Sequence, residues 1–479
     1  MLLLVCLFNA VNSSANSIHK LEDLPAPSGH WLLGHLRPFQ RGPKHLVLEN
    51  WAQECGDLFR IRLGPSKFLV SAHPHINGEI LKRRPEDFRR HPKISEILEE
   101  MGVLAVFNAE DDLWRKYRKP TAEALNLRKV KSFYPILVRK AAQLLKRCGE
   151  FEETGAALDI SALLRRFTTD VTTAIAFGYE LDTLSGKDDH LQQCMEMVFP
   201  MVNDRMSAPL PWWRIIRSKR DRQFDESLST VRGTILQFIG NARERLALDP
   251  SLKDKPTNFL EALLSEEQAL TSEEVYSAVF TLLMAGEDTT ANSLAWVMFY
   301  LANYPEVVSR LRKEAKEVYP NLDVPNTIAQ HQHLTYAQAV VQEVIRLKPT
   351  SPQLILQAQR EVKIGHYVIP AGTNIILQNR IAQVRDAHFF QAEKFMPERW
   401  LPKGCPVHAN HQPDVVRAFG GGPRYCPGKH LALHEMVLVT SVIAKHFDLE
   451  MREHPDEIME AFSFTMHPTE FNLNLSRSN

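Results

Sequence analysis

The chain has 479 residues, with 57 Lys and Arg against 57 Asp and Glu, and 44% of its residues are hydrophobic. This balance is ordinary for a globular protein, and it excludes the broad positive field with which proteins attract nucleic acid. The 6 cysteines show no C-x-x-C spacing, which argues against a disulfide scaffold and a Cys-rich zinc site and favours a reducing compartment. We therefore expect a cytoplasmic protein that has no nucleic-acid partner.

The N-terminus begins with the apolar run MLLLVCLF and then turns polar. A transmembrane helix needs about 20 apolar residues, and the positively charged start of a secretory signal is missing. We expect residues 1–23 to form a separate N-terminal segment, either frayed or the remnant of a membrane anchor, and residues 24–479 to form the functional domain. A membrane-associated protein stays open as the alternative to a purely cytoplasmic one.

The elements of this domain follow in chain order. Alternating β-formers around Gly64-Pro65 predict a hairpin, and helical patterns dominate over residues 92–319. Strand patterns return over residues 351–378, and a final helix is expected after Cys426, with Pro427 in its first turn. No repeat or long linker interrupts the chain, so the sequence predicts one mainly α-helical unit with small β-sheets.

One long apolar helix carries a polar notch. Thr271 and Glu274 have the spacing of a capping box, Pro305 ends the segment, and the length between them corresponds to about 48 Å of helix. The middle of this helix reads AGEDTT at residues 285–290. Small residues let a ligand approach, and buried hydroxyls and carboxylates need partners, so the notch suits proton delivery to a bound ligand. A helix that merely exposes one polar turn is the alternative.

The most unusual stretch is AFGGGPRYCPGKH at residues 418–430, which holds four of only 21 glycines, where average usage would give about 34. Pro423 and His430 occupy two positions that a phosphate-binding loop needs for other residues. We expect Cys426 beside the N-terminus of the final helix, whose N–H groups and dipole lower the pKa of a thiol. Glycines let the loop lie close against a large flat body, which suits a thiolate ligand of haem iron. A nucleophilic cysteine or a buried free thiol remains an alternative.

A third motif is the E-x-x-R formed by Glu343 and Arg346, which share one helix face among valines and isoleucines. A buried ion pair of this kind needs further partners, and Arg399 is a candidate third member. The motif alone is common by chance.

Taken together and in this chain order, the three motifs resemble those of the cytochrome P450 family of haem-thiolate monooxygenases. The resemblance covers the chain from about Leu24 to its end, and it implies a triangular, helix-rich domain with small β-sheets. The family's loop F-x-x-G-x-R-x-C-x-G is matched by Phe419, Gly422, Arg424, Cys426 and Gly428. Its [AG]-G-x-[DE]-T-T helix is matched by Ala285, Gly286, Asp288, Thr289 and Thr290, and its early W-x-x-x-R by Trp114 and Arg118.

The resemblance also implies a role for each matched residue. Cys426 would be the proximal ligand of the iron in haem b, with Phe419 shielding the sulfur and with Gly422, Gly428 and Ala285 lining the cofactor. Asp288 and Thr289 would relay protons, whereas Glu343, Arg346 and Arg399 would stabilise the core. The residues that would bind the haem propionates are Trp114, Arg118 and Arg424. Many members add a His or Arg on the strand after the E-x-x-R helix, where this chain has Gln357 and Gln359, so one propionate contact is in doubt.

The implied activity is insertion of one oxygen atom from O2 into an apolar substrate, such as a lipid, fatty acid, terpenoid or steroid-like molecule. A haem-thiolate peroxygenase or peroxide isomerase is the alternative within the fold, although such members typically lose the acid–threonine pair. A non-catalytic haem sensor or carrier is the alternative of another class.

Electrons would come from a separate ferredoxin or flavoprotein, because the chain carries no flavin or iron–sulfur domain of its own. A basic cluster predicts an acidic donor, with a solvated charged helix as the alternative; it comprises Arg115, Lys116, Lys119, Arg128, Lys129 and Lys131. The segment PLPWWRIIRSKR at residues 209–220 combines an apolar tip with a basic flank, which predicts peripheral contact with a membrane. We expect a monomer.

Overall fold

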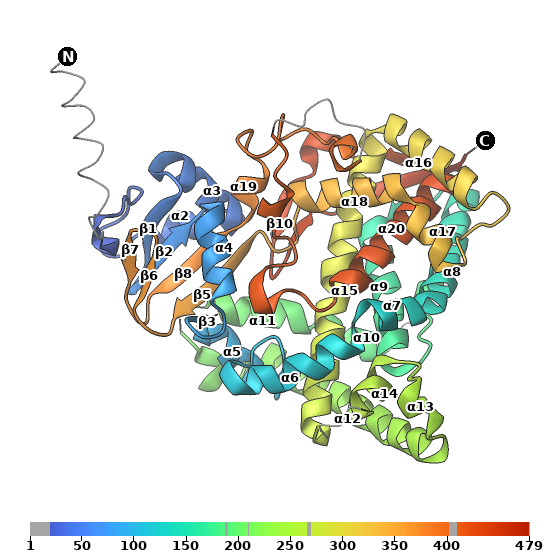
Figure 1. Cartoon of the computed structure of the whole chain (residues 1–479), viewed down its shortest axis with the longest axis horizontal. Coiled ribbons are helices and arrows are strands. Elements are labelled where there is room, and N and C mark those ends of the chain that lie inside the picture. Colours follow the sequence, from blue (N-terminus) through green and yellow to red (C-terminus); the bar gives the residue numbers. More distant parts are fainter. Residues whose placement is uncertain (1–19, 187–189, 209, 266–269, 402–409, 479) are drawn as a thin grey trace. The chain divides into compact units, whose positions relative to one another are not determined.

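The structure is a computed structural model that describes residues 20–186, 190–208, 210–265, 270–401 and 410–478. Most of the predicted N-terminal segment therefore lies outside the described residues. The chain divides into two units, drawn mainly in blue and orange and in cyan to red in Figure 1. The sheet unit comprises residues 20–92, 352–383 and 414–425, and the helical unit comprises residues 93–351, 384–413 and 426–478.

The sheet unit is built on a five-stranded sheet in the order β1-β2-β8-β5-β3. The predicted hairpin is confirmed, because β1 (Leu58–Leu63) and β2 (Ser66–Ser71) pair antiparallel around Gly64, whose φ is +60°. β2 then pairs in parallel with β8 (Asn374–Gln378), so the sheet joins strands from distant parts of the chain. The other elements of this unit are α2 (Leu36–Gln40), α3 (Lys44–Cys55), α4 (Pro74–Lys82), α19 (Arg380–Gln383), β3 (Phe88–Arg90), β5 (Gln353–Ala358), β6 (Val362–Ile364) and β7 (Tyr367–Ile369).

The helical unit confirms the predicted dominance of helices over residues 92–319. Its first helices are α5 (Pro92–Glu100), α6 (Asp111–Ala124), α7 (Leu127–Ser132), α8 (Tyr134–Thr154), α9 (Ile160–Phe177), α10 (His190–Glu196) and α11 (Val198–Ser207). They are followed by α12 (Lys219–Leu248), α13 (Ser251–Asp254), α14 (Phe259–Leu264), α15 (Ser272–Asn303), α16 (Pro305–Val318), α17 (Ile328–His333), α18 (Thr335–Leu347) and α20 (Lys429–His446).

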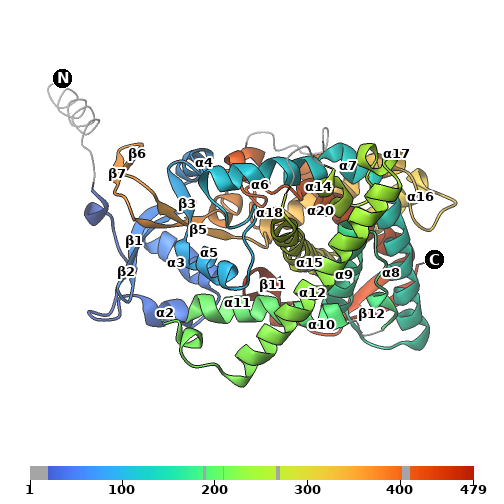
Figure 2. The same cartoon turned by 90° about the horizontal axis from the view of Figure 1, so that it is seen from below.

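The long notched helix α15 has 32 residues and begins with the predicted capping box. The Thr271 backbone N–H donates to the Glu274 carboxylate at 2.9 Å, and the Glu274 N–H donates to Thr271 Oγ1 at 3.3 Å. α15 packs against α9, α12, α18 and α20, and Figure 2 views it nearly along its axis among these helices. Neighbours on several sides explain why this helix is apolar over most of its surface.

The end of the chain differs from the sequence prediction in two ways. Gly428 is the N-cap of α20, so Pro427 precedes the helix instead of occupying its first turn. Strands also follow α20, although the sequence predicted only the helix, because segments this short carry little periodicity. β9 (Phe447–Met451) and β12 (Asn472–Arg477) form a sheet in the order β4-β12-β9 with β4 (Leu158–Asp159), and β10 (Glu460–Phe462) pairs with β11 (Met466–Pro468).

Candidate active site

The glycine-rich loop contributes its first half to the sheet unit. Gly420 and Gly422 adopt φ angles of +73° and +64°, which L-residues with a side chain rarely adopt. A Cβ at Gly422 would lie 2.1 Å from the backbone oxygen of Leu81, at the end of α4. The loop therefore needs glycine at this position to pass α4, a reason that the sequence did not provide.

Cys426 lies in the helical unit, two residues before the N-cap of α20. The N–H groups of Gly428 and Lys429 and the charge of Arg118 all favour the thiolate, but burial opposes them and raises the pKa of Cys426 above its ordinary value. The N–H groups at the helix N-terminus thus lower this pKa, as predicted, but desolvation outweighs them.

Trp114 and Arg118 lie one helical turn apart on α6, so they share one face of that helix. Trp114 is buried, Arg118 is half-buried, and the charge of Arg118 acts on the thiol of Cys426. Arg424, in the short 3-10 helix η6 (Gly422–Arg424), and Phe419 are half-buried residues of the sheet unit.

The polar notch of α15 is built from residues 285–289. Ala285 is exposed, Glu287 is buried, and Thr289 Oγ1 donates to the backbone oxygen of Ala285 at 2.7 Å. Asp288 accepts a hydrogen bond from Thr465 Oγ1. Asn292 Nδ2 in turn donates to Thr465 Oγ1 at 3.0 Å.

Thr465 and Asn292 were not singled out in the sequence. Thr465 precedes β11 and lies 177 positions from Asp288, so no local pattern connects the two residues. Asn292 lies one turn after Asp288 on α15, and that i,i+4 spacing was the only available signal.

Glu343 is the centre of a buried polar network within the helical unit. Arg346 donates to both carboxylate oxygens of Glu343 at 2.8 Å, and Arg399 Nε donates to Oε1 at 2.9 Å. The Trp400 indole N–H and the Met396 backbone N–H complete the set at 2.9 and 3.0 Å. Two guanidinium groups and two neutral donors thus surround one carboxylate, as a buried ion pair requires.

Comparison with known proteins adds a decisive observation to this geometry. The family profile described as Cytochrome P450 matches residues 24–475. The chain belongs to the cytochrome P450 family. It is therefore a P450 monooxygenase, an oxidoreductase whose cofactor is a haem with a thiolate ligand.

Individual P450s are similar along most of the chain. Cyclooctat-9-en-7-ol 5-monooxygenase of Streptomyces melanosporofaciens is 28% identical, over 88% of this chain and 89% of that protein. Protein LUTEIN DEFICIENT 5, chloroplastic, and carotene epsilon-monooxygenase, both of Arabidopsis thaliana, are 27% and 25% identical over 87% and 89% of this chain, and over 71% and 81% of their own lengths. The crystal structure of the P450 CYP102L1 aligns with a TM-score of 0.83 at 21% identity, covering 95% of this chain and 99% of that one, which confirms the predicted fold.

The residues around Cys426 fit the thiolate ligand of a P450. Two backbone N–H groups and the charges of Arg118 and Lys429 act on the sulfur, and these groups favour the anionic form that binds iron. A Cβ at Gly428 would lie 3.8 Å from Cys426 Sγ, an ordinary van der Waals contact, so the sulfur does not require glycine at this position.

Many P450s carry another propionate-binding cation on the strand after the E-x-x-R helix, and this chain has a glutamine there. Gln357 lies on β5, and Arg89 lies directly opposite it on β3. The Arg89 Nη2 group donates to Gln357 Oε1 at 2.7 Å, and Gln357 Nε2 donates to Asn374 Oδ1 at 3.1 Å. A guanidinium group from the neighbouring strand therefore stands beside the glutamine.

Proposed function

We propose that this P450 holds haem b on Cys426 and inserts one oxygen atom of O2 into an apolar substrate, with electrons from a separate donor. When bound, the haem supplies the oxygen chemistry, and the thiolate tunes it. The polar notch of α15 carries this proposal, since Asp288 and Thr289 place a carboxylate and a hydroxyl side by side in the middle of a mostly apolar helix. The alternatives, a peroxygenase, a peroxide isomerase or a haem sensor, would not need a proton path there.

The roles that we assign to the other residues follow from their positions. Asp288 is held by Thr465, so we propose that this hydrogen bond sets the orientation in which Asp288 passes protons to Thr289. We propose that Ala285 leaves space beside the cofactor and that Phe419 shields the Cys426 sulfur. Glu343, Arg346 and Arg399 stabilise the core of the helical unit without touching the reacting atoms.

The carbon monoxide difference spectrum of the reduced holoenzyme tests the proposed ligand. We expect the red-shifted Soret band of a thiolate-bound haem in the wild type and its loss in Cys426→Ser. If Cys426→Ser kept this band, the assignment of the ligand would be wrong. A proton relay at Asp288 would be refuted if Asp288→Asn turned over substrate at the wild-type rate with an unchanged solvent isotope effect.

We propose that Arg89 supplies the propionate contact missing from β5, in addition to Trp114, Arg118 and Arg424. An arginine beside Gln357 offers the charge-assisted hydrogen bonds that carboxylates prefer. Replacing Arg89 by Met should speed the transfer of haem to apomyoglobin several-fold while leaving the thiolate spectrum unchanged. Haem transfer from the Arg89→Met variant at the wild-type rate would show that Arg89 does not bind a propionate.

We propose a terpenoid-like substrate. Its support is that similar P450s are named for cyclooctat-9-en-7-ol and carotene, both hydrocarbon-rich. Met101, Val103 and Met284 also belong to one hydrophobic cluster of the helical unit, which offers apolar surroundings. A panel of isoprenoids and fatty acids, scored by the low-to-high spin shift of the haem, would decide between these classes, and shifts from fatty acids alone would contradict the terpenoid proposal.

We propose that the basic cluster receives an acidic electron donor. Arg115 is ion-paired with Asp112 at 2.6 Å, and Lys116 is ion-paired with Glu274, so these two cations are partly neutralised. Lys119, Arg128 and Lys131 are the main docking charges in this proposal. We also propose that the haem domain begins at Leu24 and that the protein acts as a monomer, which sedimentation velocity would test.

We propose that residues 210–216 touch a membrane surface. Leu210, Trp212, Ile215 and Ile216 are 61%, 50%, 87% and 73% exposed, and such a group of exposed apolar residues favours an interface. Among the helices of the described residues, none has the length and hydropathy of a membrane span. Replacing Ile215 and Ile216 by Ser should weaken binding to anionic lipid vesicles several-fold, whereas Leu248→Ser, at a single exposed leucine, should not.

A further inference from the structure

One face of α15 carries a stripe of polar and small residues in the middle of the helical unit. Its members, spaced three or four positions apart, are Ser277, Thr281, Ala285, Asp288 and Asn292. This spacing places side chains in a row along one helix face. Gly286 lies on the opposite side, where a Cβ would lie 2.9 Å from Thr172 Oγ1 of α9, so the stripe faces away from α9.

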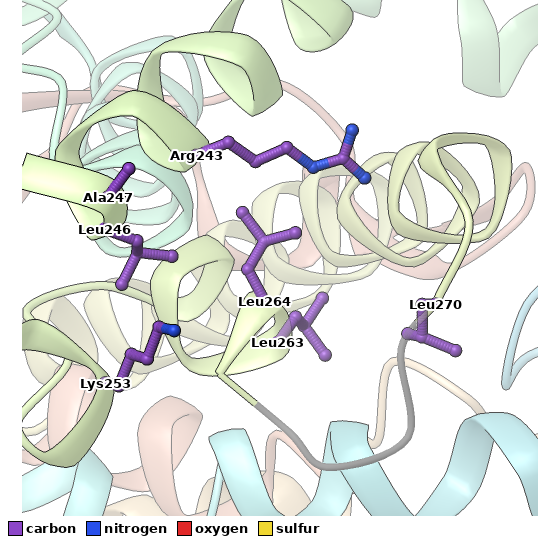
Figure 3. Close-up of a pocket in the computed structure, with 7 residues that line it drawn as sticks. All are labelled: Arg243, Leu246, Ala247, Lys253, Leu263, Leu264 and Leu270. Atoms are coloured by element: carbon purple, nitrogen blue, oxygen red, sulfur yellow. The ribbon is translucent and has the colours of Figure 1, made fainter. Parts of the chain in front are cut away.

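Both ends of the stripe are bonded to other segments of the helical unit. At its start, the Ser277 hydroxyl is hydrogen-bonded to the backbone of residues 102–104. At its end, Asp288 and Asn292 are hydrogen-bonded to Thr465. The surface hollow in Figure 3 lies elsewhere, at the beginning of α15, and none of its lining residues belongs to the stripe.

The two segments that bind the ends of the stripe also approach each other. Phe107 follows the first segment and Phe464 precedes Thr465, and their ring centroids are 6.3 Å apart. Thr281 and Ala285 lie between the two bonded ends. Ala285 is exposed, although residues 278–284 before it are all buried. The middle of the stripe therefore offers surface on which a ligand can pack.

Thr281 carries a buried hydroxyl that no described group satisfies. The residue is 8% exposed, and its Oγ1 atom has no hydrogen-bond partner among the described residues. Thr289 and Ser293 on the same helix instead donate to backbone oxygens one turn earlier, at 2.7 and 2.9 Å. A buried hydroxyl without a partner costs free energy, so Thr281 is suited to a partner that arrives from outside the chain.

We propose that the Thr281 hydroxyl binds a hydroxyl group of the substrate, which makes the substrate an isoprenoid alcohol. This inference rests on the proposed function and narrows its terpenoid-like substrate. Four positions of helix place Thr281 about 6 Å from Ala285 along the axis, so the oxygen of the substrate would bind at Thr281 while its hydrocarbon covers Ala285.

The stripe disfavours two other kinds of substrate. A pure hydrocarbon would leave the Thr281 hydroxyl unpaired, and a site built to bind a hydroxyl group discriminates against an analogue that lacks it. A fatty acid would bring a carboxylate to a stripe that holds Asp288 and no cation, so like charges would oppose its binding.

Spin-state titration of the holoenzyme with farnesol and with farnesene, a hydrocarbon of the same skeleton, tests this inference. Thr281→Val keeps the shape of the side chain and removes its hydroxyl, so the preference for farnesol over farnesene should fall about tenfold. Thr281→Ser retains the hydroxyl and should retain the preference. Thr172→Val is the matched control, because Thr172 also has a buried hydroxyl without a partner among the described residues but lies on α9; it should bind both compounds as wild type does.

Urea unfolding of the substrate-free holoenzyme gives a second readout. Thr281→Val should raise the unfolding midpoint, because it removes an unpaired buried hydroxyl, whereas the loss of a structural hydrogen bond would lower it. A lower midpoint would therefore overturn the inference. An unchanged preference in Thr281→Val would also overturn it and would assign the hydroxyl to a bound water, and failure of farnesol to bind wild type would be equally decisive.

The carbon monoxide spectrum separates this inference from the proposed function. Absence of the red-shifted Soret band from wild type would refute the proposed function itself. An intact band together with an unchanged preference in Thr281→Val would refute the alcohol-binding role of Thr281 alone.

Discussion

At the scale of single residues, Glu343 shows how one side chain secures a core. Its carboxylate is fully buried and accepts hydrogen bonds from Arg346, Arg399, Trp400 and a backbone N–H group. The low dielectric strengthens these bonds, and the same low dielectric makes any unpaired member costly. The network therefore stabilises the core most when every one of its hydrogen bonds is formed.

Glu343→Gln should destabilise the protein by about 3–5 kcal/mol, because it leaves two buried guanidinium groups without a counter-charge. Urea unfolding of the holoenzyme, followed by the haem absorbance and by circular dichroism, would measure this loss. Glu317→Gln is the matched control on the exposed surface and should change the free energy of unfolding by less than about 0.5 kcal/mol. Equal midpoints for the two variants would contradict the structural role of Glu343.

At the scale of elements, α9 and α15 approach closely at Gly286. A Cβ there would lie 2.9 Å from Thr172 Oγ1 and 3.0 Å from Thr172 Cγ2, both tighter than side chains normally allow. The Thr172 hydroxyl is buried and has no hydrogen-bond partner among the described residues, so its removal forfeits no hydrogen bond. Glycine in the notch therefore serves helix packing as well as ligand access.

Gly286→Ala gains about 1 kcal/mol of helix propensity but should lose about 1–3 kcal/mol to overpacking against Thr172. Combining it with Thr172→Ala removes both clashing atoms. The change in the free energy of unfolding of the double variant should therefore be at least about 1 kcal/mol more favourable than the sum of the changes in the two single variants. Thr168→Ala on the same helix, whose hydroxyl bonds to its own helix at 3.1 Å, should instead be additive with Gly286→Ala. An additive result with Thr172 would show that the helices simply move apart.

α17 and α20 meet through two stacked imidazoles, His331 and His434, with ring centroids 4.7 Å apart. Burial, followed by the charge of His434, lowers the pKa of His331 to about 3. Burial also lowers the pKa of His434, which lies near His430 and Lys131. Both rings are therefore neutral when folded at pH 7, although an unfolded histidine has a pKa near 6.5.

These folded-state pKa values lie below the unfolded values, so the unfolded chain takes up protons first as the pH falls. The contribution of the two neutral histidines to the free energy of unfolding should be fully present above about pH 6.5. Below that pH the free energy of unfolding should decrease by up to about 1.4 kcal/mol per pH unit for each histidine. His331→Phe keeps the stacking and removes one titrating group, so it should flatten the dependence between about pH 6.5 and 4 in urea titrations. His333→Gln, at an exposed neighbour, should keep the wild-type slope of the free energy of unfolding against pH. An unchanged slope in His331→Phe would show that groups other than His331 cause this pH dependence.

At the scale of the whole molecule, the formal net charge of zero means that any steering of a partner depends on local charge. Reversing Lys119, Arg128 and Lys131 to Glu should slow electron transfer from an acidic ferredoxin about tenfold at low ionic strength, and the difference should shrink as salt increases. Reversing Lys313, Lys316 and Arg452 changes net charge equally on other elements and should have little effect. Stopped-flow reduction of the haem would measure both, and equal rates would eliminate the cluster as the docking surface.

The sequence predicted those features that rest on local spacing. The hairpin around Gly64, the capping box at Thr271 and the helix-rich fold all follow from neighbours within a few positions. Trp400 beside Glu343, Thr465 beside Asp288 and Arg89 beside Gln357 did not emerge, because each pairs residues at least 57 positions apart. The sequence also did not predict that burial outweighs the helix N-terminus in setting the pKa of Cys426, because burial cannot be read from a motif.

The parallel pairing of β2 with β8, in which Phe68 lies opposite Asn374, sets a condition on biosynthesis. The strand β2 leaves the ribosome long before its partner exists, and at about 5–20 residues per second the wait is roughly 15–60 s. During that time one edge of the first hairpin has no strand beside it, which is a template for aggregation. We therefore expect nascent chains to depend on a chaperone until β8 emerges, and truncation before Asn374 to yield insoluble protein although every residue of the hairpin is present.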